Sequence, residues 1–180
     1  MNTILTKLKS EKKYVCIHTD EANPSKFIFG KIIGFDTKSF AVSMVSPDGE
    51  YDGVLVKQID DILYINQSLS YEEKMKKLMR IKGYDEKITD TSDSNSNIIE
   101  WSLFLAKKIG VIISVEINHS GVDDITGFVE SIDEGICKMI LVNEYGVEDG
   151  VSFFALRDIS QICLDSCDER RLLTLFQYDD

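Results

Sequence analysis

The sequence predicts a mainly β protein in which two small five-stranded antiparallel barrels follow one another, each flanked by short α-helices. The main observation is an internal repeat, because residues 49–65 return as residues 146–162 with identical spacing. Each copy contains a glycine turn, an Asp-Gly dipeptide typical of hairpins, a β-rich run and a final short strand. Comparing each residue with the one 97 positions later needs no gap over residues 4–79, and the identities fall on turn glycines, turn aspartates and periodic apolar positions. These observations indicate a duplicated fold.

The first copy begins with a short helix, predicted from the apolar residues Ile4, Leu5 and Leu8. The repeated segment supplies its last two strands. Alternating apolar residues predict three earlier strands, at residues 14–19, 27–35 and 40–45.

A closing helix is predicted from a capping-box pattern at residues 70–73 and extends to about residue 82. One of its faces is apolar and carries Tyr71, Met75, Leu78 and Met79. The order helix, five strands, helix therefore defines one unit.

Three segments follow from this repeat. Residues 1–82 form the first small barrel with its helices, and residues 98–180 form the second, acidic one. Residues 83–97 are rich in Asp, Ser, Asn and Thr, which predicts a polar linker. The second unit opens with a helix at residues 98–108 that is apolar nearly all round, so we expect Trp101 to be buried.

The charge of the chain is unevenly distributed. The formal net charge is -11, with +2 over residues 1–82 and -10 over residues 98–180. Nucleic-acid affinity comes largely from basic residues that neutralise phosphates, so this balance disfavours RNA as a partner. No apolar run approaches the roughly 18 residues that span a bilayer, and no signal-peptide pattern is present. We therefore expect a cytoplasmic protein with no membrane contact.

The four cysteines predict no metal site. Cys16 and Cys137 lie within apolar strand patterns, where cysteine is usually a small buried hydrophobe. Cys163 and Cys167 have no third and fourth partner at the spacing of a zinc site. An alternative role for Cys167 is redox reactivity, because it lies near the start of a predicted helix. No cofactor motif is present.

Catalytic motifs are also missing from the pattern. His18 and His119 are not at matching positions of the two copies, and neither belongs to a nucleophile motif. Adjacent acidic residues in turn-like segments do not by themselves define the geometry of a general acid and base. The pairs are Asp60 with Asp61, Asp123 with Asp124, and Asp179 with Asp180. We expect no enzymatic activity.

Residues 30–36, GKIIGFD, followed by residues 40–42, FAV, resemble the first signature of Sm-like proteins. These are small SH3-like five-stranded barrels opened by an N-terminal helix, and residues 127–133, GFVESID, keep the signature in part. The resemblance implies RNA binding through an asparagine after this motif and an arginine-glycine pair before the last strand. The matching places here hold Phe40 with residues 58–59, and Cys137 with residues 155–156, so neither copy has the gripping groups. Phe40 is predicted to be a core residue from its alternation with Val42.

The sequence thus predicts a non-catalytic protein-binding or scaffold module, with a basic protein partner or self-association. One alternative is an Sm-like RNA-binding regulator, and another is a cytosolic immunity-type inhibitor of a basic toxin enzyme. Five charged residues are the candidate interaction surface: Lys74, Lys77 and Arg80 on the closing helix of the first unit, and Glu148 and Asp149 in the second.

Overall fold

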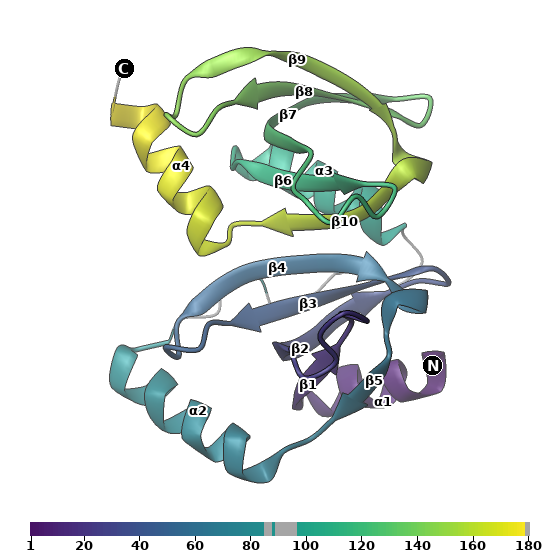
Figure 1. Ribbon diagram of the computed structural model, residues 1–180, viewed down its shortest axis with the longest axis vertical. Helices are drawn as coiled ribbons and strands as arrows, with labels where there is room; N and C mark the ends of the chain where they lie inside the picture. Colours follow the sequence, from purple (N-terminus) through teal and green to yellow (C-terminus); the bar gives the residue numbers. More distant parts are fainter. Residues whose placement is uncertain (85–87, 89–96, 179–180) are drawn as a thin grey trace. The chain divides into compact units, whose positions relative to one another are not determined.

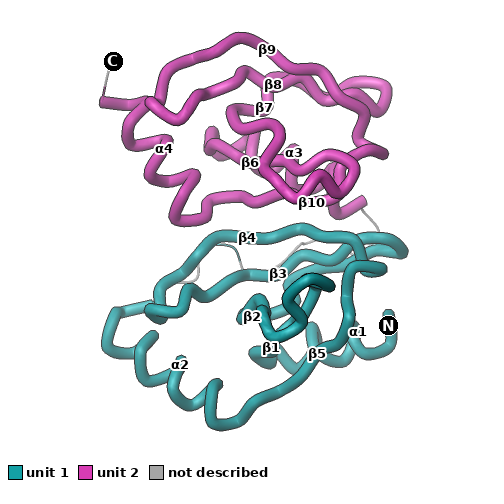
Figure 2. Tube along the Cα trace, in the orientation of Figure 1, with its two compact units in different colours: residues 1–95 teal, residues 96–180 magenta. Residues whose placement is uncertain are grey.

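A computed structural model describes residues 1–84, 88 and 97–178. The chain divides into two compact units, Met1–Asn95 and Ser96–Asp180 (Figure 2). Both are mainly β, and every strand pairing within each unit is antiparallel. Most of the predicted linker, together with Asp179 and Asp180, lies outside the described residues.

The described part of unit 1 contains two helices, five strands and one short 3-10 turn, which can be followed in Figure 1. Its strands follow the order β5-β1-β2-β3-β4 in the sheet. The elements are α1 (Asn2–Glu11), β1 (Tyr14–His18), β2 (Ile28–Phe35), β3 (Ser39–Val45), β4 (Tyr51–Gln58), η1 (Ile59–Asp61), β5 (Tyr64–Asn66) and α2 (Leu69–Lys82).

Unit 2 repeats this series of elements, and its strands follow the order β10-β6-β7-β8-β9. Its elements are α3 (Ile98–Ile109), β6 (Ile113–Ile117), β7 (Ile125–Asp133), β8 (Ile136–Val142), β9 (Glu148–Ala155), η2 (Leu156–Asp158), β10 (Ile159–Leu164) and α4 (Cys167–Tyr178). The bounds of β8, β9 and η2 are those of β3, β4 and η1 moved by 97 residues.

The mainly β, antiparallel fold with flanking helices is confirmed, whereas the two closed barrels are not. Within the described part of unit 1, β5 pairs with β1 and not with β4. In unit 2, β10 likewise pairs with β6 and not with β9. The sheet of each unit therefore has an open strand order. The 3-10 turn after the fourth strand directs the chain back to the first strand, so the fifth strand pairs there.

The hairpin turns that precede β4 and β9 pack against the closing helices at glycine residues. Gly49 and Gly146 have φ angles of 82° and 80°, in the left-handed region that favours glycine. A Cβ atom on Gly49 would lie 2.6 Å from Leu78 Cβ, and one on Gly146 would lie 2.6 Å from Leu175 Cβ. The same contact thus occurs in both units, again 97 residues apart.

The two Asp-Gly dipeptides do not form hairpin turns, contrary to the prediction. Each lies inside a strand, at a shift of register between Ser43 and Val45 in unit 1 and between Ile140 and Val142 in unit 2. The glycines, Gly53 and Gly150, have φ angles of 78° and 91°. A β-bulge accepts glycine at positive φ as readily as a tight turn does, so the dipeptide fits both.

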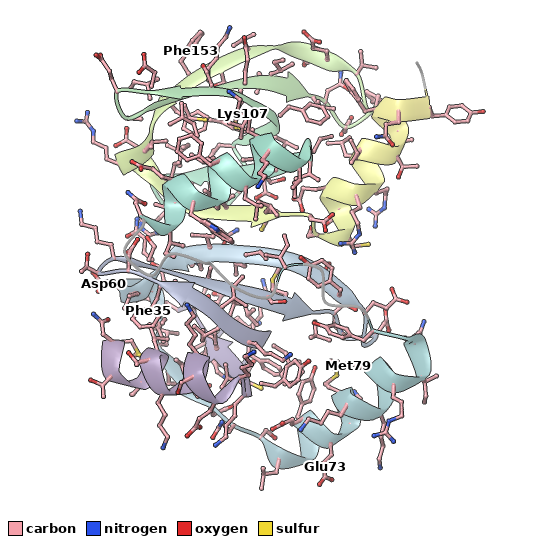
Figure 3. The ribbon with its side chains drawn as sticks, turned by 180° about the vertical axis from the view of Figure 1, so that it is seen from behind. Phe35, Asp60, Glu73, Met79, Lys107 and Phe153 are labelled. Carbon is pink, nitrogen blue, oxygen red and sulfur yellow. The ribbon has the colours of Figure 1, made fainter. Side chains whose placement is uncertain are left out.

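The closing helix of unit 1 has the predicted apolar face, with Met75 and Met79 buried in one core cluster. Figure 3 labels Met79 on this helix. Phe40 is fully buried, as predicted for a core residue. The predicted capping box at residues 70–73 is wrong. Helix α2 begins at Leu69, and the side chain of Ser68, the residue before it, makes no cap hydrogen bond.

Trp101 is half-buried, so its predicted burial is only partly met. Helix α3 packs on β7 and β10 and buries Ile98 and Leu103, whereas Phe104 is 54% exposed. The helix is therefore buried along one face, although its sequence is apolar nearly all round.

Candidate functional site

Strand β9 forms the outer edge of unit 2. It pairs with β8 on one side, and no strand of the described part of the unit pairs with its other side. A free sheet edge presents backbone N–H and C=O groups to solvent, and long apolar edges pair readily with other chains. Because β9 is 8 residues long, this edge is a candidate binding surface.

One face of the β8–β9 pair is exposed and apolar. Phe154 of β9 faces the core beside Cys137, which is fully buried. Phe153 and Val151 alternate with the core-facing residues and point to the other face. Phe153 is 67% exposed and Val151 is 44% exposed, and Figure 3 shows Phe153 on the outer surface of the unit.

Two further residues of this face, Ile136 and Lys138, come from β8. Ile136 is opposite Ala155 and is 43% exposed. Lys138 is opposite Phe153, with its Nζ 5.8 Å from the centre of the Phe153 ring. The same Nζ lies 2.8 Å from Glu130, so this lysine is neutralised by an acid of its own unit. We call Ile136, Val151 and Phe153 the apolar edge patch.

Acidic residues lie at both ends of this patch. Glu148 and Asp149, which the sequence singled out, are exposed at the start of β9. Asp133 and Glu134 are exposed near its other end, because Asp133 is paired with Ile136, which is opposite Ala155. The patch is therefore apolar at its centre and acidic at its two ends.

The basic candidate residues are in unit 1. Lys74, Lys77 and Arg80 are exposed on α2. The Lys74 Nζ lies 5.6 Å from the centre of the Tyr71 ring, a cation–π contact. The structure therefore presents both predicted groups to solvent, each on its own unit.

A row of aromatic rings lies near these lysines in unit 1. Tyr71 contacts Phe27 and Phe29 edge to face, each with ring centres 5.1 Å apart. Phe29 in turn stacks on Tyr14, over which Lys31 lies at 4.6 Å. Phe27 is 37% exposed, whereas Phe29 is buried, so the row is open to solvent only in part.

The positions at which the Sm-like resemblance implies RNA-binding residues stabilise the fold in this protein. Phe40 is fully buried and cannot stack on a base. The Ile59 amide donates a hydrogen bond to the Lys38 carbonyl oxygen at 2.7 Å, which joins η1 to the β2–β3 turn. In that turn the Asp36 carboxylate accepts hydrogen bonds from the amides of Lys38 and Ser39.

Unit 1 also has a surface groove of about 590 Å³ between α1 and β5. Ile4, Leu8 and Ile65 line its apolar part, and Lys7 also lines it. Glu11 and Lys13 also line it and form an ion pair at 2.8 Å. The groove thus combines an apolar surface with charged side chains, of which Glu11 and Lys13 are paired with each other.

The buried polar groups stabilise loops and helix ends. Glu169 is buried and accepts hydrogen bonds from Ser114 Oγ at 2.7 Å and from the Ser166 amide at 3.0 Å. Glu116 accepts one from the Gly121 amide at 2.7 Å. Partial burial, followed by repulsion from Glu116, Asp168 and Asp124, raises the pKa of Asp123. The hydrogen bond between Glu116 and Gly121 thus helps to close the β6–β7 loop.

Cys16, Cys137 and His18 are buried, whereas Cys167 is exposed. Burial raises the pKa of Cys137 to about 11, so this thiol is protonated at neutral pH. The His18 Nδ1 donates to the Pro24 carbonyl oxygen at 2.8 Å, and the ring stacks on Tyr64 at 3.9 Å. Within residues 1–84, 88 and 97–178, no three His, Cys, Asp or Glu side chains are arranged to hold a metal ion.

No protein-family model, curated protein or solved structure matches this chain. No helix in the described ranges is both long and apolar enough to cross a bilayer. The fold and surface define a mainly β, antiparallel protein with an exposed sheet edge that is apolar and acidic. Its function is argued from that geometry.

The charge pattern of the sequence indicated the acidic pair of this surface, whereas its apolar edge patch was not predicted. Phe153 and Phe154 are adjacent, and adjacent residues of a strand point to opposite faces. Only one of the two rings can face the core, unless other elements cover both faces of β9. That signal was present, but the sequence did not show which strand would lie at an edge.

Proposed function

We propose that this protein is a non-catalytic protein-binding or scaffold module whose second unit recognises a basic partner protein. The observation that carries the proposal is the exposed edge of unit 2, where the apolar edge patch is flanked by Glu148 and Asp149 at one end and by acids at the other. Protein interfaces commonly combine an apolar centre with a polar rim. An apolar patch of this kind on a free edge marks an interaction site.

We further propose that the two units derive from duplication of one small Sm-like or SH3-like barrel. The shared series of elements, the constant offset of 97 residues, and the equivalent contacts of Gly49 and Gly146 support this. A helix before five antiparallel strands is the arrangement that the resemblance implies. Fold alone does not assign function, so the binding role depends on the surface.

Charge supports the choice of a basic partner. Residues 98–180 carry a net charge of -10, which steers a positively charged surface toward unit 2 and speeds their encounter. An immunity-type inhibitor of a basic toxin enzyme is one concrete form of this proposal. Such an inhibitor needs an acidic recognition surface and no catalytic group of its own.

A capture experiment tests the proposal. The wild-type protein and the double variant Glu148→Lys with Asp149→Lys are used as baits in extract from the native source, and protein and RNA are quantified separately. We expect a basic protein to bind the wild type and to associate roughly tenfold more slowly with the variant at low salt.

A matched control makes the same change in net charge on unit 1, through Glu21→Lys and Asp60→Lys, two exposed residues outside the candidate surface. The control should associate as the wild type does. Equal slowing of both variants would show that net charge alone matters, and capture of RNA without protein would reject the proposal.

An Sm-like RNA-binding role is the second candidate, and the aromatic row of unit 1 favours it. Lys31 and Lys74 lie over Tyr14 and Tyr71, and a base can stack on an aromatic ring while lysines contact phosphates. Fluorescence anisotropy with short oligouridine at moderate salt tests this role. Sub-micromolar affinity that is lost in Lys74→Glu with Lys77→Glu would favour RNA over the protein partner.

A further inference from the structure

The hydrogen-bond pattern of the β8–β9 hairpin shows which backbone groups of β9 face its free edge. The Leu156 amide donates to the Gly135 carbonyl oxygen at 2.9 Å, so these two opposed residues are hydrogen-bonded to each other. In an antiparallel ladder, hydrogen-bonded pairs alternate with pairs that are not. Phe154 and Ser152 are in the same phase as Leu156 and turn their N–H and C=O groups toward β8.

Ala155, Phe153 and Val151 are in the opposite phase. Their backbone N–H and C=O groups therefore point away from β8, toward the side on which no described strand of unit 2 pairs. The bulge at Asp149 and Gly150 ends this regular stretch. The free edge thus offers alternate donor and acceptor groups from residue 151 to residue 155.

The residues with outward backbone groups also carry the exposed side chains. Phe153 is 67% exposed and Val151 is 44% exposed, on the face of β9 that points away from the core. A strand added at this edge would hydrogen-bond to these residues and place its own alternate side chains beside Phe153 and Val151. Backbone pairing and apolar contact therefore coincide at one place.

The charges at the ends of β9 select the occupant. Glu148 and Asp149 are exposed at its start, and Asp133 and Glu134 are exposed near its other end. Lysine or arginine side chains of an added strand would meet these acids. A second copy of unit 2 is disfavoured, because each carries a net charge of -10 and like charges repel.

We propose that β9 accepts an extended segment of a partner protein as an additional strand, and that this segment alternates apolar with basic residues. The inference depends on the proposed protein-binding function and specifies how the same surface binds. The apolar residues of the segment cover Phe153 and Val151, and its basic residues meet the acids at the two ends of β9.

Backbone methylation of a probe peptide tests the strand pairing. The probe is a fluorescent eight-residue peptide of alternating valine and lysine, measured by anisotropy at low salt. Two derivatives are compared, one N-methylated on every valine and the other on every lysine. Alternate N–H groups of a strand point to opposite edges, so one derivative loses the donors that face β9 and the other keeps them.

We expect one derivative to bind at least about tenfold more weakly than the parent, and the other to stay within about threefold, because one series of hydrogen bonds is lost. A peptide of alternating valine and glutamate should not bind. Equal binding of both methylated derivatives would overturn strand addition while leaving a protein-binding surface in place. Absence of binding by the parent peptide would also overturn it, and the capture experiment decides separately whether a basic partner exists.

A pair of variants of this protein tests the same edge, with the probe peptide unchanged. Val151→Pro removes an N–H that points outward, whereas Val151→Thr keeps it and has a similar shape. The proline variant should lose at least about tenfold in affinity for the parent peptide, and the threonine variant much less. Equal affinities would contradict the proposal, and if the proline variant fails to fold, the methylated peptides still decide. A dimer of the wild type that Val151→Pro abolishes would show that a second copy is the occupant, which would also overturn it.

Discussion

Replacement of Gly146 by alanine should destabilise unit 2 through a contact that the structure defines closely. The new Cβ would lie 2.6 Å from Leu175 Cβ and 2.8 Å from the Leu175 carbonyl carbon, so the turn or α4 must move. Overpacking of this kind costs about 1 to 3 kcal/mol. The φ angle of 80° adds about 1 to 2 kcal/mol for a residue with a side chain.

Gly121→Ala separates these two contributions. Gly121 has a φ angle of 82°, but an added Cβ would meet no atom within 4 Å. The control therefore loses about 1 to 2 kcal/mol from backbone strain alone, whereas Gly146→Ala loses about 2 to 5 kcal/mol from strain and overpacking together.

Urea unfolding followed by the fluorescence of Trp101 measures both losses in unit 2. Trp101 lies on α3 and is the single tryptophan of the chain, so its signal belongs to that unit. Equal losses for the two variants would refute the packing of the β8–β9 turn on α4. The corresponding variant Gly49→Ala should destabilise unit 1 by a similar amount, because its added Cβ would also lie 2.6 Å from a leucine.

Three further predictions follow from the site. Asp123→Asn should raise the midpoint of thermal unfolding at pH 7, because partial burial and then nearby carboxylates raise the pKa of Asp123 and its ionisation opposes folding; the gain should vanish as the pH falls below 3.8, and a gain independent of pH would contradict this. Iodoacetamide should label the exposed Cys167 in the native protein and reach Cys137, with its pKa of about 11, only after unfolding; early labelling of Cys137 would show that it is not buried. Oligouridine should bind no more tightly than micromolar at moderate salt, because Phe40 is buried and the chain is acidic, and sub-micromolar anisotropy would reject this.

The sequence predicted the elements well where local periodicity determines them. Alternation predicted strands at residues 27–35 and 40–45, and the structure has them at 28–35 and 39–45. Helical spacing likewise predicted the apolar face of α2. The Asp-Gly dipeptides were misassigned, because both a tight turn and a bulge place glycine at positive φ. Local pattern alone did not separate these two conformations.

Strand pairing was less predictable than strand position. Whether the last strand of a unit pairs with the first or closes on the fourth depends on contacts between distant residues, which periodicity does not report. For the same reason the exposure of Phe153 escaped prediction, since Val56 occupies the equivalent place in β4 and is buried. The acids Glu148 and Asp149 were found because a charge pattern is visible without knowledge of pairing.

Amide hydrogen exchange across residues 151–155, followed by NMR in the free protein and with the valine-lysine peptide, tests the central claim most directly. In the free protein the amides of Val151, Phe153 and Ala155 should exchange rapidly, whereas those of Ser152 and Phe154 should be protected by β8. Addition of the peptide should protect the three outward amides. Uniform exchange along β9 in the free protein, or protection that appears elsewhere on unit 2 when the peptide binds, would contradict the assignment of β9 as the binding edge.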